Sequence, residues 1–176
     1  MIRIIAGEFK GHKLKSGLDR PGFRPTKDRV KESLFSILGD ISGYNVLDIF
    51  AGSGNLGFEA LSRGAKHVSF VENNFLQANI ISENVEKLHS HDRTSIIKKN
   101  VLLFLKKTTE SYDLIFADPP YQLKQVSELI DDLVDNFKDT QIVLETGHRF
   151  DIPEKIKELD PVVKIYGNTK LIIFKV

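Results

Sequence analysis

The chain has 176 residues and a mass of 19.9 kDa, a size that fits one globular domain better than two. Hydrophobic residues make up 41% and charged residues 28%, which excludes a disordered or fibrous chain. Cysteine is absent, so disulfides, thiolate zinc sites and cysteine nucleophiles are excluded. The longest apolar run covers residues 101–105, far short of the ~20 residues of a membrane helix, and no signal segment opens the chain. We therefore expect a cytoplasmic protein that does not associate with membranes.

The net charge of +1 conceals an uneven distribution of charge along the chain. Residues 1–31 carry nine basic and three acidic side chains, whereas the rest of the chain carries 16 basic and 21 acidic ones. A basic arm on a mildly acidic body indicates a polyanionic partner at one end of the molecule. On charge alone, a merely solvated N-terminal segment is the alternative.

The segment before residue 44 predicts a hairpin, a loop and one helix. Residues 3–6 and 13–15 are the expected hairpin strands, and a loop rich in glycine and proline follows them. Thr26 can cap the helix, whose expected apolar face consists of Val30, Leu34, Ile37 and Leu38.

After residue 44, short β-rich runs alternate with amphipathic stretches. We expect strands over residues 45–50, 67–71, 95–98, 113–117 and 141–145, separated by helices near 54–63, 75–88, 100–107, 122–137 and 153–157. This alternation predicts βαβ units and a parallel sheet of the α/β class. Residues 162–166 and 170–174 flank the turn pair Gly167-Asn168, so the chain should end in a hairpin that adds an antiparallel strand.

A glycine-rich loop lies between the first predicted strand of the sheet and the helix after it. Gly52, Gly54 and Gly57 spell G-x-G-x-x-G, and Glu72 lies 20 residues after Gly52, the pattern of a dinucleotide-binding loop. Asp48, near the strand end, argues against a pyrophosphate, because two like charges would meet in a partly desolvated crevice. A tight strand–helix turn that binds nothing is the alternative.

A ligand with an ammonium and a sulfonium group fits this loop better, and S-adenosylmethionine is such a ligand. Gly52 and Gly54 would let the backbone approach it, because a Cβ would clash. Asp48 would orient the ammonium end, and Glu72 would accept hydrogen bonds from the ribose hydroxyls.

The second motif, DLIFADPPY at residues 113–121, predicts chemistry on the exocyclic amino group of a planar base. Asp118 follows a buried strand, and Pro119 and Pro120 end that strand, so the carboxylate should face the crevice where open α/β sheets bind ligands. If the Asp118 carboxylate and the Pro119 carbonyl accept the two amino hydrogens, the nitrogen can pyramidalise toward a methyl donor. Tyr121 would stack on the base. This chemistry requires no metal.

A base inside a duplex is out of reach of such a site, so the target must be flipped out or unpaired. The basic N-terminal segment is the expected clamp on the nucleic-acid backbone. The residues assigned to this contact are Arg3, Lys10, Lys13, Arg20, Arg24, Thr26 and Lys27.

As a whole, the chain resembles the small bacterial 16S ribosomal RNA guanine-N2 methyltransferase family. The segments that carry the resemblance are RIIAGEFKGHKL (3–14), RPTKDRVKESLFSIL (24–38), LDIFAGSGNLGFEALSRGA (47–65), FVENN (70–74) and FADPPY (116–121). The glycine loop and DPPY occur in many amino methyltransferases, whereas the RPT-x-DRV-x-E block is much more specific.

The resemblance implies a class I, Rossmann-like methyltransferase fold, with a seven-stranded, mostly parallel sheet whose last strand is antiparallel. It also implies methylation of one guanine N2 in 16S rRNA on the assembling small ribosomal subunit. Separately, we expect a basic hairpin and loop extension over residues 1–25, a methyltransferase domain over 26–176, and a monomer.

The resemblance further assigns roles to individual residues. The target-binding, catalytic residues are Asp118, Pro119, Pro120 and Tyr121. The cofactor-binding residues are Asp48, Phe50, Ala51, Gly52, Ser53, Gly54, Glu72, Asn73, Asn100 and Val101. Asn100 stands where relatives of this fold place an acid that contacts the adenine ring.

Three rival functions are open. The first is an N6-adenine methyltransferase acting on DNA or RNA, and the second is a non-catalytic RNA-binding module that retains the fold. The third is a nucleotide-dependent oxidoreductase.

Overall fold

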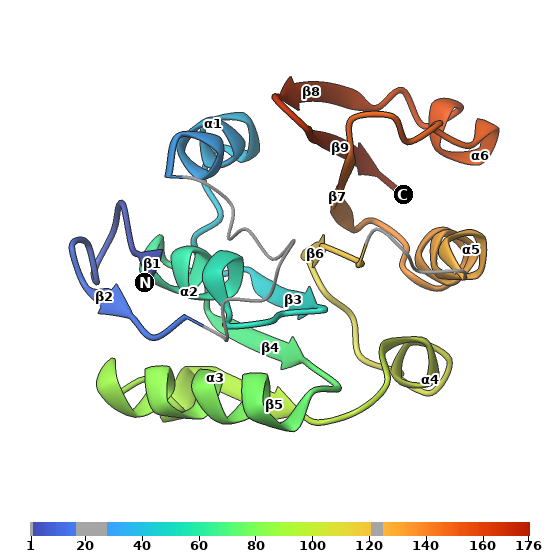
Figure 1. Ribbon diagram of the computed structural model, residues 1–176. Coiled ribbons are helices and arrows are strands. Elements are labelled where there is room, and N and C mark those ends of the chain that lie inside the picture. The colour runs from blue at the N-terminus through green and yellow to red at the C-terminus, as the bar shows by residue number, and fades with distance from the viewer. Residues whose placement is uncertain (1, 17–27, 121–124) are drawn as a thin grey trace.

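The structure is a computed structural model that describes residues 2–16, 28–120 and 125–176 (Figure 1). Several predicted residues lie outside these ranges: Arg20, Arg24, Thr26, Lys27 and Tyr121. The predicted cap of the first helix by Thr26 therefore also lies outside the described residues.

The centre of the molecule is the predicted seven-stranded sheet, with the strand order β5-β4-β3-β6-β7-β9-β8. The pairs among β5, β4, β3, β6 and β7 are parallel, whereas β9 is antiparallel to both β7 and β8. The expected antiparallel last strand is confirmed, and it is inserted between β7 and the edge strand β8. The strands are β3 (Asn45–Ile49), β4 (His67–Val71), β5 (Thr94–Ile97), β6 (Leu114–Ala117), β7 (Gln141–Gly147), β8 (Val162–Tyr166) and β9 (Thr169–Lys175).

Helices cover both faces of the sheet, and each face has its own apolar core. One core is shared with α1 (Asp28–Leu38), α2 (Asn55–Ser62) and α3 (Phe75–Lys87). The other is shared with α4 (Val101–Leu105), α5 (Val126–Asn136) and α6 (Glu154–Lys157). A short 3-10 turn, η1 (His91–Arg93), precedes β5. None of the helices in the described ranges has the length and hydrophobicity needed to cross a bilayer.

The N-terminal hairpin is shorter than predicted. Its strands are β1 (Ile2–Arg3) and β2 (Lys13–Leu14). Ile4 still bonds His12 and Gly11 across the hairpin, whereas the N–H groups of Ile5 and Ala6 bond Glu59 of α2 instead. Its apolar side chains belong to the same core as α1, α2 and α3: Ile2, Ile4, Phe9 and Leu14. The division of the chain at residue 25 stays a prediction.

The parallel register decides where the site lies. Ile49 pairs with Val71 on one side and with Ala117 on the other, so β3, β4 and β6 end at the same edge of the sheet. Ligands of open α/β sheets bind at this carboxyl edge. Strand β3 ends at Ile49, one residue earlier than predicted, because Phe50 has a φ of 57° and leaves the extended conformation.

Candidate active site

The glycine loop connects β3 to α2 at the carboxyl edge. Gly52 and Gly54 have φ values of 57° and 80°, a left-handed conformation that glycine adopts without the penalty of a Cβ. The Gly54 N–H donates to the Ala51 carbonyl (2.7 Å), and the Gly54 carbonyl accepts from the Phe58 N–H (2.9 Å). The loop therefore turns the chain directly from the strand into the helix, as the motif predicts.

Glu72 joins the end of β4 to the glycine loop. Its Oε2 accepts a hydrogen bond from the Gly52 N–H (2.8 Å), and its Oε1 accepts one from the Asn74 N–H (2.7 Å). A carboxylate has about four lone-pair sites, so both oxygens can still accept bonds from a pair of hydroxyls. The neighbouring Asn73 is exposed.

Asp48 lies beneath the loop, with 5% of its surface exposed. Its Oδ2 accepts a hydrogen bond from the Gly57 N–H in the first turn of α2 (2.9 Å). Burial raises the pKa of Asp48 to about 8, and the Glu72 carboxylate adds to the shift, although the bond from Gly57 opposes it. A cation beside this side chain would stabilise its ionised form.

Gly57 allows α2 to pack closely on the sheet. A Cβ at this position would lie 2.3 Å from Cε1 of the buried Phe70 and 2.9 Å from Oδ2 of Asp48. We expect Gly57→Ala to lower the free energy of unfolding by about 1–3 kcal/mol, because the helix must shift to relieve the overlap. The same shift should weaken cofactor binding through Asp48. Urea denaturation and calorimetric titration measure the two effects, and an unchanged stability would contradict this packing.

Asp118 converges with Asp48 from the neighbouring strand. It directly follows β6, whose Phe116 pairs with Asp48 and whose Ala117 pairs with Ile49. The half-buried Asp118 carboxyl has a pKa well above its usual range, mainly through burial and then through the charges of Glu145 and Asp48. The two motifs that were distant in the sequence therefore share one edge of the sheet.

Glu145 is an acid of this edge that sequence reasoning missed. Ala117 pairs with Leu144, so Asp118 and Glu145 are the next residues along two neighbouring parallel strands, and Glu145 is 5% exposed. Glu145 is the last residue of the predicted strand 141–145, and Asp118 directly follows the predicted strand 113–117. An acid at the end of a neighbouring parallel strand was therefore the sequence signal that could have identified Glu145 as a site residue. The strand continues to Gly147, two residues further than predicted.

The remaining predicted site residues lie around these acids. Pro119 is buried and Pro120 is exposed. Phe50, Ala51 and Ser53 belong to the glycine loop, and Ser53 is buried. Their contacts with a cofactor stay predictions.

Asn100 and Val101 open helix α4. The Asn100 Oδ1 accepts a hydrogen bond from the Leu103 N–H (3.2 Å), so this side chain caps the helix. Val101 belongs to the core, and its side chain is buried. Asn100 borders a pocket of about 400 Å³ that runs along α4.

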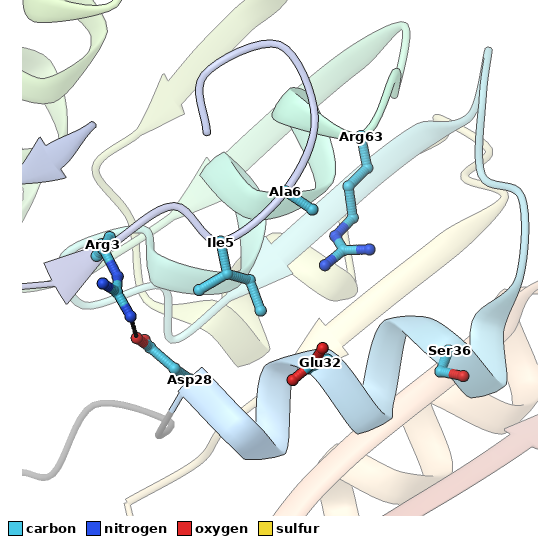
Figure 2. A pocket seen from close by; sticks show the side chains of 7 residues that line it. All are labelled: Arg3, Ile5, Ala6, Asp28, Glu32, Ser36 and Arg63. Carbon is cyan, nitrogen blue, oxygen red and sulfur yellow. Dashed lines mark hydrogen bonds and ion pairs between the residues drawn. The ribbon is translucent and has the colours of Figure 1, made fainter. Parts of the chain in front are cut away.

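Three predicted nucleic-acid contacts lie on the described part of the hairpin, where Arg3, Lys10 and Lys13 are all exposed. Arg3 forms an ion pair with Asp28 at the start of α1 (2.6 Å). This pair lies in a pocket of about 450 Å³ between the hairpin, α1 and Arg63, the residue after α2. Figure 2 shows the side chains that line it. Because acidic side chains also line this pocket, its charge is mixed.

The residues present fit a cationic nucleoside cofactor. Two carboxylates, Asp48 and Glu72, bond the chain at a loop in which Gly52 and Gly54 have no Cβ to obstruct a ligand. Because the pKa of the buried Asp48 is about 8, a nearby cation would shift this group to its ionised form. Within the described ranges, no group of His, Asp and Glu side chains could hold a metal ion.

The sheet order, the antiparallel β9 and the glycine loop after the first parallel strand define the class I methyltransferase fold. SMU.776, described as a candidate methyltransferase and solved in complex with SAH, shares this fold. It superposes with a TM-score of 0.69 at 17% identity, over 96% of this chain and 52% of that one. SAH is S-adenosylhomocysteine, the demethylated form of S-adenosylmethionine, so that protein of the same fold holds the product form of the predicted cofactor.

The chain belongs to the family described as Conserved hypothetical protein 95, whose model matches residues 2–175. It is 42% identical to Ribosomal RNA small subunit methyltransferase D of Haemophilus influenzae, over 77% of this chain and 72% of the relative. The solved structure of yhhF from Escherichia coli, described as a candidate methyltransferase, matches with a TM-score of 0.83 at 32% identity, over 98% of this chain and 96% of that one. The predicted resemblance to small-subunit rRNA methyltransferases is thereby confirmed.

Proposed function

We propose that the protein transfers a methyl group from S-adenosylmethionine to the exocyclic N2 of one guanine in 16S rRNA. It would act as a cytoplasmic monomer on the assembling small ribosomal subunit. The observation that carries the proposal is the convergence of Asp48 and Asp118 at one edge of the sheet. The names of the rRNA methyltransferases in the family supply the class of substrate.

On the cofactor side, the bound group would supply an electrophilic methyl on a positively charged sulfur. Asp48 would orient and balance the ammonium end, and Glu72 would accept bonds from the ribose hydroxyls in addition to its two backbone partners. Asn100 and Val101 would border the adenine ring, the first through the amide nitrogen that its capping bond leaves available.

On the target side, the lone pair of an exocyclic amino nitrogen is delocalised into the ring, which makes it a poor nucleophile. The Asp118 carboxylate and the Pro119 carbonyl would accept its two hydrogens, and Tyr121 would stack on the base. The raised pKa of Asp118 suits it to take up the proton that the nitrogen loses on methylation. Arg3, Lys10 and Lys13, with Arg20, Arg24, Thr26 and Lys27, would hold the RNA backbone.

The pKa of Asp48 predicts that cofactor binding releases a proton. In the free protein this group is mostly protonated at pH 7, since its pKa is about 8, and an adjacent ammonium would favour its ionised form. Affinity for S-adenosylmethionine should therefore rise, by up to about tenfold, as the pH increases from 6 to 7. Titration calorimetry in two buffers with different ionisation enthalpies measures the released proton. Asp48→Asn should bind more weakly and release none, whereas equal proton release in both proteins would contradict the assignment.

Transfer of a tritiated methyl group tests the proposed function against its rivals. The substrates are unmodified small subunits, naked 16S rRNA and DNA, and we expect label in the ribosomal substrates. Label in DNA alone would identify the adenine methyltransferase instead. RNA binding without any transfer would identify the non-catalytic module, and calorimetric binding of NAD(P) without S-adenosylmethionine binding would identify the oxidoreductase.

A further inference from the structure

Two buried polar side chains connect the N-terminal hairpin to the glycine loop, and no step of the proposed reaction uses them. The first is Lys31 of α1, which is only 1% exposed. Its ammonium donates to the Arg3 carbonyl in β1 (2.6 Å) and to Oδ1 of Asn55, the first residue of α2 (3.0 Å). Asn55 directly follows Gly54, so one ammonium bonds the hairpin on one side and the end of the cofactor loop on the other.

The second side chain is Asn84 of α3, which is fully buried. Its Oδ1 accepts from the Lys15 N–H (2.8 Å), and its Nδ2 donates to the Lys15 carbonyl (3.1 Å), just after β2. The same Nδ2 lies 3.4 Å from the Ser53 carbonyl inside the glycine loop. Asn84 thus bonds both Lys15, directly after the second hairpin strand, and the glycine loop.

Glu59 completes the first connection. It is fully buried, lies 3.4 Å from the Lys31 ammonium, and accepts hydrogen bonds from the N–H groups of Ile5 (2.9 Å) and Ala6 (3.1 Å). Glu59 also accepts a hydrogen bond from Nε of Arg63 (2.9 Å), which does not belong to the hairpin. If the hairpin moves away, Lys31 loses the Arg3 carbonyl and Glu59 loses two of its donors, which costs free energy. The loop and the hairpin therefore share one set of buried hydrogen bonds.

From these contacts we infer that Lys31 and Asn84 are positioning residues that couple cofactor binding at the glycine loop to nucleic-acid binding at the hairpin. The inference rests on the proposed function, since it takes the basic hairpin as the RNA contact. RNA that holds the hairpin also holds Lys31 and Asn84, and through them Asn55 and the Ser53 carbonyl, in the arrangement that the cofactor contacts. Linkage makes the effect reciprocal, so the cofactor tightens RNA binding by the same factor.

The test is a thermodynamic cycle on the 176-residue chain. S-adenosylhomocysteine, which has no methyl group to transfer, is titrated by calorimetry with and without saturating unmodified 16S rRNA transcript. For the wild type we expect the RNA to lower the Kd at least fivefold, within the usual range of coupling. The measured quantity is the ratio of the Kd without RNA to the Kd with RNA. Lys31→Met and, separately, Asn84→Ala should each reduce this ratio to less than twofold. A general loss of stability would not produce that result, because the ratio compares two titrations of the same folded protein.

Lys87→Met is the matched control. Lys87 of α3 donates to the Lys13 carbonyl and so holds the hairpin, but it has no bond with the glycine loop among the described contacts. The Lys87→Met variant loses the same charge as Lys31→Met and should keep the wild-type ratio of the two Kd values. Two outcomes would overturn the coupling but not the proposed function. In the first, RNA binds to the wild type and is methylated but leaves the Kd of S-adenosylhomocysteine unchanged. In the second, Lys31→Met and Asn84→Ala both keep the wild-type ratio. A transcript and small subunits that neither bind nor accept methyl would overturn the proposed function together with this inference.

Discussion

Asp118→Ala should lower kcat for methyl transfer by about 10³-fold or more while the Kd for S-adenosylmethionine stays within about twofold of the wild type. In the proposed function the carboxylate would act on the target nitrogen and take up its proton, and such positioned groups contribute about 10²–10⁴-fold each. Asp48 and Glu72, which would hold the cofactor, keep their backbone partners in the variant. The variant should also fold, because removing Asp118 relieves its repulsion with Glu145 and Asp48.

Single-turnover kinetics with radiolabelled cofactor and calorimetry measure the two quantities. Asp92→Ala is a control that removes an exposed carboxylate from η1, at the opposite end of the parallel strands, and it should change neither. Full residual turnover in Asp118→Ala, or loss of cofactor binding in this variant, would refute the assignment.

Glu59→Ala should lower the free energy of unfolding by about 3–5 kcal/mol, the usual result of breaking a buried ion pair by removing one partner. The substitution leaves the buried Lys31 without its counter-charge, and the N–H groups of Ile5 and Ala6 without their acceptor. Burial already lowers the pKa of Lys31, and loss of Glu59 removes the largest effect that opposes this.

Urea denaturation followed by circular dichroism measures this loss. Glu83→Ala removes an exposed ion pair between Lys15 and α3, on the same hairpin, and should cost no more than about 1 kcal/mol. An effect of Glu59→Ala that is no larger than that of Glu83→Ala would show that the buried pair does not hold the hairpin on the domain.

Most of the sheet was predictable from the sequence because its strands are short apolar runs that end in turn residues or acids. The strand over residues 67–71 is confirmed to the residue, and the helix expected near 122–137 is confirmed as α5, with Leu129, Ile130, Leu133 and Val134 buried. The terminal hairpin around Gly167 is confirmed as well. The hairpin at the N-terminus was less predictable, since its chain path depends on tertiary bonds from Glu59 rather than on its own pattern.

The core of the candidate site was predictable because its acids stand at strand ends. Glu72 and Asp118 each follow a parallel strand, Asp48 lies one residue before the end of another, and the topology brings such positions together. Lys31 and Asn84 were not predictable in this way. A lysine or an asparagine in a helix is usually exposed, and only the tertiary arrangement of α1, α2, α3 and the hairpin supplies enough acceptors to bury them.

The central claim is that one crevice presents a methyl donor to the N2 of a guanine in ribosomal RNA. Mass spectrometry of the nucleosides from 16S rRNA, after unmodified small subunits are incubated with the protein and S-adenosylmethionine, tests it most directly. The claim predicts N2-methylguanosine, present with the wild-type protein and absent with Asp118→Ala. N6-methyladenosine in its place, or no methylated nucleoside from a protein that binds the cofactor, would contradict it.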